Sequence, residues 1–379
     1  MIVVFAGSIG RFPVGGHAWV DLQYLLGFRE LGCEVYYLEE CGEGSWVYDW
    51  EAEKLTTDLA YPTSYLSSCL EPTGLGDRWI YRAGDASVGM DVREFREVCE
   101  AADLLLVRGC PLELWRDEYT APRRKAFVDS DPGFTQFKLA RRHSAMSATV
   151  DRCDRLFTVG GCVGSRTCSI PTVGREWIPM LPPVCLSAWP EAQHDDATHF
   201  TSVMQWRSYD EVTHEGTTYG NKNLEFPKFM DLPQRTKQPL RIAVTGLPPS
   251  RLSERGWDVV VGWKAVWSAE DYRQFVLRSR GEFAVAKHGY VSTRGGWVSD
   301  RTACYLAAGR PALVQDTGQG DWLPVGEGLL TFQTLEGAVQ GIECINSDYS
   351  CHRAAARRLA EEHFSATRVL SSVLDASLI

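Results

Sequence analysis

The chain alternates short apolar runs with longer segments whose apolar residues recur at helical spacing. The apolar runs predict strands, because buried parallel strands read as nearly continuous hydrophobic stretches. They cover residues 2–6, 34–40, 102–109, 125–131 and 155–161 in the first half, and 199–206, 240–246, 257–263, 282–289, 310–318 and 328–332 in the second. Helices are predicted at about residues 17–31, 269–280, 299–308, 335–346 and 351–363. Strands that alternate with helices imply βαβ units and parallel sheets.

One segment breaks this alternation. Residues 178–199 contain four prolines and lack a clear period, which is typical of a linker between domains. At 379 residues the chain also exceeds the length of one ordinary hydrophobic core. We therefore predict an α/β protein with two doubly wound Rossmann-like domains that face a central cleft, where the carboxyl ends of the strands bind ligands. The predicted units are residues 1–185, 186–350 and a C-terminal helix at 351–379 that can pack back on the first domain.

Composition and charge narrow the class of protein. Hydrophobic residues make up 44% of the chain and charged residues 23%, which is ordinary for a globular protein. The formal net charge of −10 argues against a general nucleic-acid binder, because such proteins need positive patches to displace counterions. No nucleic-acid partner is therefore expected. No apolar run approaches the roughly 18–20 residues of a membrane span, and the opening MIVVFAG predicts a strand and no signal peptide.

Twelve cysteines are scattered from Cys33 to Cys351 without the close pairs that zinc sites use. Cys162 and Cys168 are the nearest approach to a cluster, and no metal site is predicted there. Reduced thiols without a disulfide framework are typical of a reducing compartment, so we expect a cytoplasmic protein.

Residues 295–318 (GGWVSDRTACYLAAGRPALVQDTG) combine three features of a phosphate site. Gly295 and Gly296 allow close approach of the backbone to a ligand. Ser299 is a good N-cap, and the residues that follow it suit a helix that Gly309 ends. A glycine loop before a capped helix start favours an anion, because the free N–H groups and the helix dipole both point at it.

Three stretches resemble the two-Rossmann glycosyltransferases of the GT-B type. Residues 13–40 place a glycine-rich loop before a helix, a Gly and a second strand, like that family's opening. Residues 307–332 resemble the helix, strand and loop of its donor-side domain, and residues 204–226 resemble a first strand followed by the Arg and Lys that hold the donor diphosphate. The resemblance implies a UDP- or TDP-linked sugar donor in the C-terminal domain and a hydroxyl acceptor, for example a natural-product aglycone, in the N-terminal one. It implies no metal or other cofactor, since a helix end and basic side chains meet the diphosphate charge.

The resemblance also assigns donor contacts. These are Arg207, Lys222, Lys287 and Arg294, with Gly295, Gly296 and Ser299 at the helix start. Many relatives carry a ribose-binding glutamate where this chain has Cys304, and Asp300, one turn earlier, is the expected substitute. Asp321 is expected to accept hydrogen bonds from donor-sugar hydroxyls, with Asp316 as the competing choice.

His17 is the predicted catalytic residue. It follows the first glycine loop, and a neutral histidine suits a general base near pH 7. Asp129 or Asp131, at a neighbouring strand end, is expected to orient the imidazole, and Gly15 and Gly16 are expected to contact the acceptor. In retaining relatives a histidine contacts the donor sugar instead, so the stereochemistry stays open. The D-x-D pattern of these aspartates is interpreted as an acceptor contact or a turn and not as a metal site.

Other functions stay open at this stage. A sugar-nucleotide epimerase on the same fold would turn over the donor without an acceptor, and Cys304 is compatible with a nucleotide-binding scaffold that has lost catalysis. A nicotinamide-dependent oxidoreductase fits less well, because GSIGRFPVGG is not G-x-G-x-x-G, although Glu39 ends the second strand. A homodimer is compatible with all of these. Aromatic faces stack on bases and sugars, and we expect one or two loop tryptophans to contact ligand among Trp206, Trp263, Trp267, Trp297 and Trp322.

Overall fold

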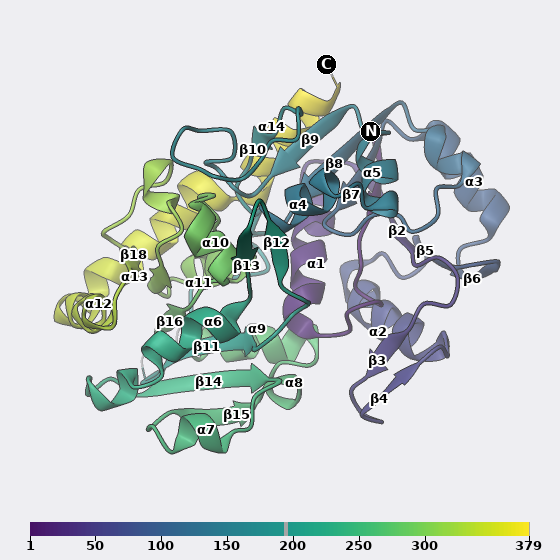
Figure 1. Ribbon diagram of the computed structural model, residues 1–379. Coiled ribbons are helices and arrows are strands. Elements are labelled where there is room, and N and C mark those ends of the chain that lie inside the picture. Colours follow the sequence, from purple (N-terminus) through teal and green to yellow (C-terminus); the bar gives the residue numbers. More distant parts are fainter. Residues whose placement is uncertain (193–195, 379) are drawn as a thin grey trace.

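Two parallel sheets organise the molecule. The computed structural model describes residues 1–192 and 196–378, and Figure 1 shows one sheet in each half of it. The first domain is built on an eight-stranded sheet with the order β10-β9-β8-β7-β1-β2-β5-β6, in which β6 runs antiparallel to β5. Its strands are β1 (Ile2–Ala6), β2 (Glu34–Glu40), β5 (Trp79–Ala83), β6 (Ala86–Gly89), β7 (Leu104–Arg108), β8 (Arg124–Asp129), β9 (Arg155–Thr158) and β10 (Ile178–Pro179).

The second domain is built on a six-stranded parallel sheet with the order β15-β14-β11-β16-β17-β18. Its strands are β11 (Phe200–Gln205), β14 (Leu240–Thr245), β15 (Asp258–Val261), β16 (Gly281–Ala284), β17 (Ala312–Gln315) and β18 (Leu329–Phe332). The strand order reverses between β1 and β7 in the first sheet and between β11 and β16 in the second. Such reversals are where doubly wound sheets bind ligands.

Helices cover the sheets, and two short hairpins project from them. The helices are α1 (Gly15–Glu30), α2 (Ala60–Leu70), α3 (Val92–Ala101), α4 (Phe134–Ala140), α5 (Ser144–Val150), α6 (Lys222–Glu225), α7 (Ser250–Ser253), α8 (Gly262–Ala265), α9 (Ala269–Leu277), α10 (His288–Thr293), α11 (Asp300–Ala307), α12 (Leu335–Ser347), α13 (Tyr349–Leu359) and α14 (Ala366–Leu378). The hairpins are β3–β4 (Val47–Asp49 and Lys54–Thr56) and β12–β13 (Val212–His214 and Thr217–Tyr219).

Helix α1 connects the two domains. At its start, Gly15 N donates to Val266 O (3.1 Å), and Trp19 Nε1 donates to Ala269 O at the start of α9 (2.6 Å). Further along α1, Gly27 lies against α14 so closely that a Cβ would come within 2.7 Å of Ala366. The last helix of the chain therefore lies against the first (Figure 1).

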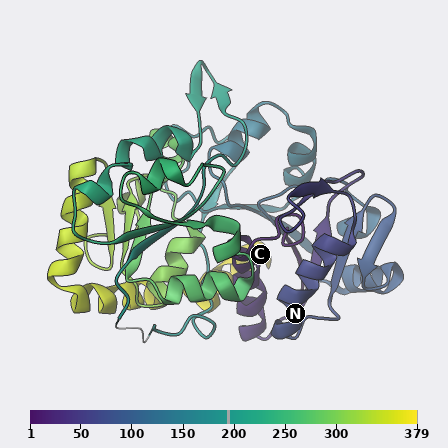
Figure 2. The same ribbon diagram turned by 90° about the horizontal axis from the view of Figure 1, so that it is seen from below.

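The hairpin β12–β13 is an insertion between Arg207 and Lys222 that crosses to the first domain. Phe137 of α4 stacks on Tyr219 with 4.4 Å between ring centroids, and Arg141 donates to the backbone of the hairpin. In Figure 2 the hairpin is the teal pair of strands that stands out between the two halves. It lengthens the segment between Arg207 and Lys222, the two residues that the resemblance assigns to the donor diphosphate.

The predicted fold class is confirmed, and every apolar run predicted as a strand forms one. The sequence interpretation missed both hairpins and the pair β5–β6. The C-terminal helix expected within residues 351–379 consists of α13, a π-helical turn (Ala360–Phe364) and α14. The first sheet ends at Pro179 and the second begins at Phe200, while the unit boundaries 1–185, 186–350 and 351–379 stay predictions. Residues 193–195 of the predicted linker and residue 379 lie outside the described residues. Within residues 1–192 and 196–378, no helix combines the length and apolarity needed to cross a bilayer.

Candidate functional site

A cavity of about 480 Å³ lies between the two domains, within the size range of ligand sites. Gln205 ends β11, Thr245 ends β14 and Gly262 follows β15, so one wall is the carboxyl edge of the second sheet. The loop after β1 and the hairpin β3–β4 supply the facing wall. From the first domain the lining residues are Arg11, Phe12, Pro13, Val14, His17, Tyr48 and Trp50, and from the second Val203, Met204, Gln205, Ser208, Ala243, Thr245, Gly262, Trp263 and Val266.

Two buried carboxylates shape the loop after β1. Asp21 accepts a hydrogen bond from Ser8 N (2.8 Å), and Glu39 accepts from Gly10 N (2.9 Å) and Arg11 N (2.5 Å). Burial raises the pKa of Glu39 to about 7, although these hydrogen bonds oppose the shift. Because Glu39 is 1% exposed and bonded to the loop, it is not free to bind the ribose of a nicotinamide cofactor.

His17 lies in the first turn of α1 and lines the cavity. Its Nε2 lies 2.8 Å from Ser8 Oγ and 3.4 Å from an Arg108 Nη. Burial lowers the pKa of His17 well below its ordinary value, and the Arg108 charge lowers it further, so the ring is neutral at pH 7. A guanidinium only donates, so Nε2 accepts and the ring proton is assigned to Nδ1. In this arrangement the basic lone pair of His17 is turned toward Arg108 and not free for an acceptor.

The groups that orient His17 differ from those expected. Asp129 is fully buried, and its carboxylate is satisfied at 2.8 Å by neighbours in the first domain. Asp131 bonds to groups of the second domain. The expectation that either aspartate orients the imidazole is therefore wrong. Arg108, at the end of β7 and paired with Asp21, takes that place.

Asp131 belongs to a largely buried cluster that joins the domains. It accepts hydrogen bonds from Lys287 Nζ (3.1 Å), from the Tyr209 hydroxyl (2.5 Å) and from the Tyr290 hydroxyl. Burial opposes ionisation of Asp131, but Lys287 and the two hydroxyls outweigh it and lower its pKa. We call these four residues the clasp. Lys287 was predicted to hold donor phosphate, but in the clasp its charge is paired with the Asp131 carboxylate.

Lys222, at the start of α6, lies among charged groups of the second domain. Burial lowers its pKa well below the ordinary value, and the neighbouring Arg301 and Lys287 lower it further, while Glu282 and Asp300 oppose the shift. Arg301 is paired with Glu282 at 2.6 Å. Within the described parts of the chain, Lys222 forms no hydrogen bond or ion pair with another side chain. A half-buried lysine whose pKa is lowered by two neighbouring cations is a site that an anion stabilises.

The other two predicted donor cations lie elsewhere. The Arg207 side chain is 60% exposed and lies 3.9 Å from Glu211. Arg294 lies 3.3 Å from Asp316 and 3.7 Å from Asp321, so the acidic residue predicted to hold donor hydroxyls is part of an ion pair. The structure therefore brings Lys222 and Lys287 together but leaves Arg207 and Arg294 outside that group.

The glycine loop before α11 is closed by one contact with the first domain and two within the second. Gly295 O accepts from Cys162 N (3.0 Å), Gly296 N donates to Thr317 O (2.8 Å), and Gly296 O accepts from Trp322 Nε1 (2.9 Å). Gly296 has φ of 70°, which favours glycine. The expectation that these glycines bind donor phosphate is corrected, because Gly295 O is bonded to the first domain and both backbone groups of Gly296 are bonded within the second.

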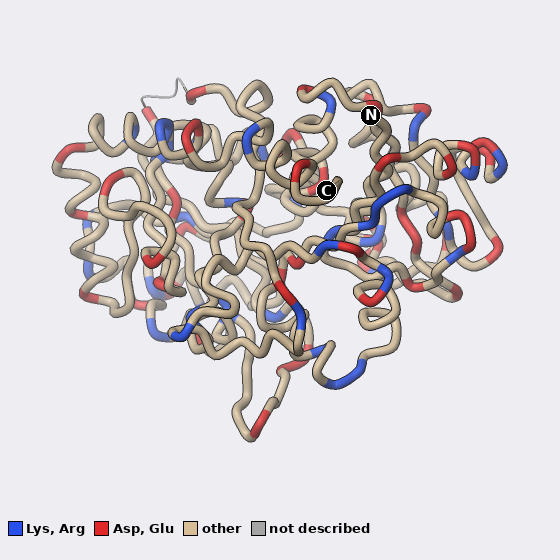
Figure 3. The backbone as a smooth tube through the Cα atoms, turned by 90° about the horizontal axis from the view of Figure 1, so that it is seen from above, with Lys and Arg blue, Asp and Glu red and all other residues tan. Residues whose placement is uncertain are grey.

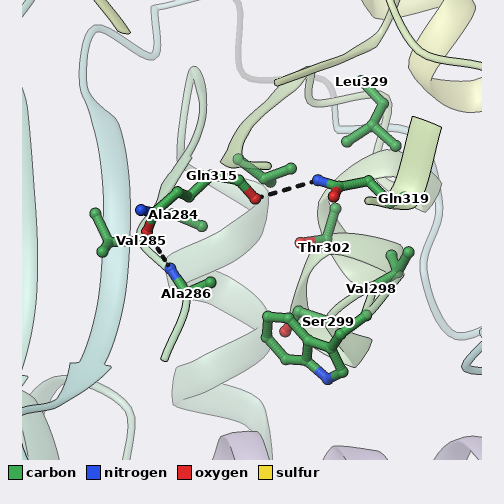
Figure 4. A pocket seen from close by; sticks show the side chains of 11 residues that line it. Ala284, Val285, Ala286, Val298, Ser299, Thr302, Gln315, Gln319 and Leu329 are labelled. Atoms are coloured by element: carbon green, nitrogen blue, oxygen red, sulfur yellow. Dashed lines mark hydrogen bonds between the residues drawn. The ribbon is translucent and has the colours of Figure 1, made fainter. Parts of the chain in front are cut away.

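The start of α11 keeps its predicted cap but has little free space. Ser299 Oγ accepts from Arg301 N (3.2 Å), which confirms the N-cap. The cavity beside Ser299 measures about 10 Å³, room for one water molecule, and Figure 4 shows Thr302 and Gln315 around it. Asp300 lines another cavity of about 10 Å³ together with Tyr24 of the first domain, and burial raises its pKa. Ser299 and Asp300 therefore face packed protein and not an open phosphate or ribose site.

Gly15 and Gly16 pack α1 against the second domain. A Cβ on Gly15 would lie 2.1 Å from Ser268 O, and one on Gly16 would lie 3.0 Å from the Tyr272 ring. Their small size therefore serves the approach of the two domains. The expectation that they contact an acceptor is wrong, because the space beside them is already filled.

No protein-family model and no curated protein matches the chain in sequence. Solved structures match its fold over nearly the whole length. An α-glucosyltransferase in complex with UDP and a 13-mer DNA aligns with a TM-score of 0.59 at 11% identity, covering 99% of this chain and 98% of that one. Anabaena HepE in complex with UDP and glucose aligns at 0.58 and 9% identity (99% and 99%), and sucrose-phosphate synthase from Thermosynechococcus elongatus at 0.53 and 13% (99% and 98%). This chain has the GT-B fold.

These comparisons correct one expectation. Four of the α-glucosyltransferase structures hold DNA, so the net charge of this chain is no ground for excluding a nucleic-acid partner from a protein of GT-B fold. Figure 3 shows Lys and Arg interspersed with Asp and Glu over both halves, so local charge differs from the total. The expectation of no nucleic-acid partner was wrong.

Cys304 occupies the position where the resemblance implies a ribose-binding glutamate. Cys304 is 3% exposed and lies 3.5 Å from Gln23 Nε2 of α1. This position of α11 therefore faces an interdomain contact. The sequence interpretation missed four residues of the site. Trp50 lines the cavity, and Ser8 and Arg108 contact His17. Arg301 is a charged neighbour of Lys222.

Proposed function

We propose that this protein is a glycosyltransferase that moves a sugar from a UDP- or TDP-linked donor to a hydroxyl of a separate acceptor. The observation that carries the proposal is the 480 Å³ cavity, which joins the carboxyl edge of the second sheet to His17 of the first domain. The GT-B fold of sugar-nucleotide enzymes supports it. A cavity walled by both domains lets their closure exclude water, which limits hydrolysis of the donor.

In this proposal the second domain binds the donor. The base and ribose occupy the edge formed by Thr245 and Gly262, and the diphosphate reaches Lys222 past Ser208. Ser208 N contacts the Asn221 side chain (3.4 Å), next to Lys222 in the chain. The lysine supplies the positive charge that stabilises a leaving diphosphate, with no metal or other cofactor required. Lys287 joins it when a phosphate replaces Asp131 as its partner.

The proposed role of His17 follows from its tautomer. With Nε2 accepting from Arg108, the neutral ring offers an Nδ1–H donor to a sugar or acceptor oxygen. General-base catalysis requires His17 to leave Arg108 first, so the donor role is the one that this arrangement supports. The free cysteines are in keeping with a cytoplasmic location, and a natural-product-like aglycone is the proposed acceptor.

The test is turnover of a panel of UDP- and TDP-sugars with and without hydroxyl acceptors. Acceptor-dependent release of nucleoside diphosphate supports the proposal. Epimerisation of the sugar without acceptor would assign an epimerase, and binding of nucleotide without any turnover would assign a scaffold. Stabilisation by NAD and by no nucleoside diphosphate would contradict the proposal.

A further inference from the structure

We infer that Phe12, Tyr48 and Trp50, facing Trp263, form an acceptor subsite for a planar, uncharged aromatic alcohol. The inference rests on the proposed function and names the substrate class of the same cavity. All four side chains line that cavity, three from the first domain and one from the second.

The aromatic side chains are arranged as a slot with exposed faces. Phe12 is 43% exposed and Tyr48 is 36% exposed. The Trp50 ring meets Tyr48 edge-on at 4.6 Å and lies nearly parallel to Trp263, with 6.3 Å between centroids and 26° between planes. Exposed aromatic faces that are grouped around a cavity mark a binding surface.

The two tryptophans of the slot are held in position by elements of different domains. Trp50 N donates to the Tyr61 hydroxyl of α2 (3.1 Å), which ties the end of hairpin β3–β4 to the first domain. Trp263 lies on α8, directly after β15 of the second sheet. Because the two rings belong to different domains, a flat ligand between them contacts both walls. Two aromatic contacts of about 3.5 Å each need about 7 Å between the ring planes, more than the 6.3 Å between the centroids, so the hairpin must move to admit a ring.

The lining favours a neutral ligand. Arg11 is the charged side chain among the residues that line the cavity, and it is paired with Glu113 at 3.0 Å. His17 is neutral, as argued above. Lys264 Nζ lies 5.2 Å from the centre of the Trp263 ring but is not a lining residue, so a charged acceptor would lose hydration without a free counter-ion in the lining.

The slot also leads to the proposed reaction centre. The Phe12 ring lies 4.9 Å from the His17 ring. An aromatic ring that contacts Phe12 and Trp50 therefore carries a hydroxyl substituent toward His17, where the donor sugar is proposed to lie. A competing occupant is the donor base, stacked on Trp263. Binding of an aromatic acceptor should depend on Trp50 of the first domain, whereas binding of the donor base on Trp263 should not.

The experiment measures binding of 2-naphthol, 2-naphthoate, UDP, TDP and a single-stranded oligonucleotide by isothermal titration calorimetry. The variants are W50L, the ring-retaining W50F and the control W46L, because Trp46 is 62% exposed outside the lining. We expect W50L to weaken 2-naphthol binding about tenfold, equivalent to about 1.4 kcal/mol, while W50F and W46L stay within about threefold of wild type. Nucleotide affinity is expected to be unchanged in all three, and 2-naphthoate to bind more weakly than 2-naphthol.

Three results would overturn the inference. They are loss of nucleotide affinity in W50L with 2-naphthol unaffected, 2-naphthoate binding as tightly as 2-naphthol, and Trp50-dependent binding of the oligonucleotide alone. Failure of UDP and TDP to bind the wild type would instead reject the proposed function, while the 2-naphthol titration still tests the slot. If W50L does not fold, the test rests on the affinity of W50F for 2-naphthol and on the comparison of 2-naphthoate with 2-naphthol in the wild type.

Discussion

The clasp between the domains yields a sharp prediction for Asp131→Ala. The Asp131 carboxylate accepts three hydrogen bonds, one of them from the Lys287 ammonium. The two side chains are 23% and 16% exposed, so removing the carboxylate leaves a mostly buried ammonium without a counter-ion. Breaking a buried pair in this way costs about 3–5 kcal/mol, and the residual exposure places this case at about 3 kcal/mol.

The assay is urea unfolding at pH 7, followed by tryptophan fluorescence. The matched control is Asp321→Ala, whose partner Arg294 lies 3.7 Å away with both side chains over 40% exposed, so its loss is expected to stay below about 1 kcal/mol. Because the pKa of Asp131 is lowered in the folded protein, its contribution is present above its unfolded pKa and is lost as the pH falls through the folded value. The difference between wild type and D131A should therefore shrink in acid. Equal, small losses in D131A and D321A would refute the reasoning.

Three further predictions concern the first domain. Burial raises the pKa of Glu39 to about 7 from 4.5, so the wild-type free energy of unfolding should fall by about 2 kcal/mol from pH 5 to 7, and E39Q should lack this slope. An unchanged slope in E39Q contradicts the assignment. Gly15→Ala forces a Cβ toward Ser268 O and should lower the melting temperature, at a cost of about 2 kcal/mol, more than Gly16→Ala does; equal melting temperatures speak against tight packing there. His17→Ala should reduce transfer about 100-fold without changing nucleotide affinity, and H17N, which keeps an N–H donor, should retain more activity; equal loss in both argues against the donor role.

The sequence predicted the fold well because its strands are buried. Runs such as Leu104–Arg108 are covered on both faces, so their hydrophobic pattern is continuous and independent of neighbours. The hairpin β3–β4 is largely solvated and has no such pattern. Elements that depend on tertiary contacts leave a weaker trace in the sequence.

The site was predicted less well, because identical residue patterns serve ligands and domain contacts. The loop at Gly295 and Gly296 has the features of a phosphate cradle, yet its backbone groups bond to Cys162 of the first domain and to Thr317 and Trp322 of its own. Nothing in the local sequence distinguishes these uses, since the partner residue Cys162 lies far away in the chain. Arg108 offered a signal that was overlooked, a charge at the end of a fully apolar strand. Such a residue is buried only when it has a partner or a function.

The central claim is that a nucleoside diphosphate binds in the cleft with its phosphates at Lys222. Calorimetric titration of UDP and TDP into wild type, K222M and the exposed control R207M tests it most directly. We predict that at least one nucleotide binds, because a phosphate supplies a counter-charge to Lys222 and raises its depressed pKa. K222M should weaken binding at least tenfold and R207M should change it less than twofold. Absence of binding to the wild type, or equal affinity in K222M, would contradict the account.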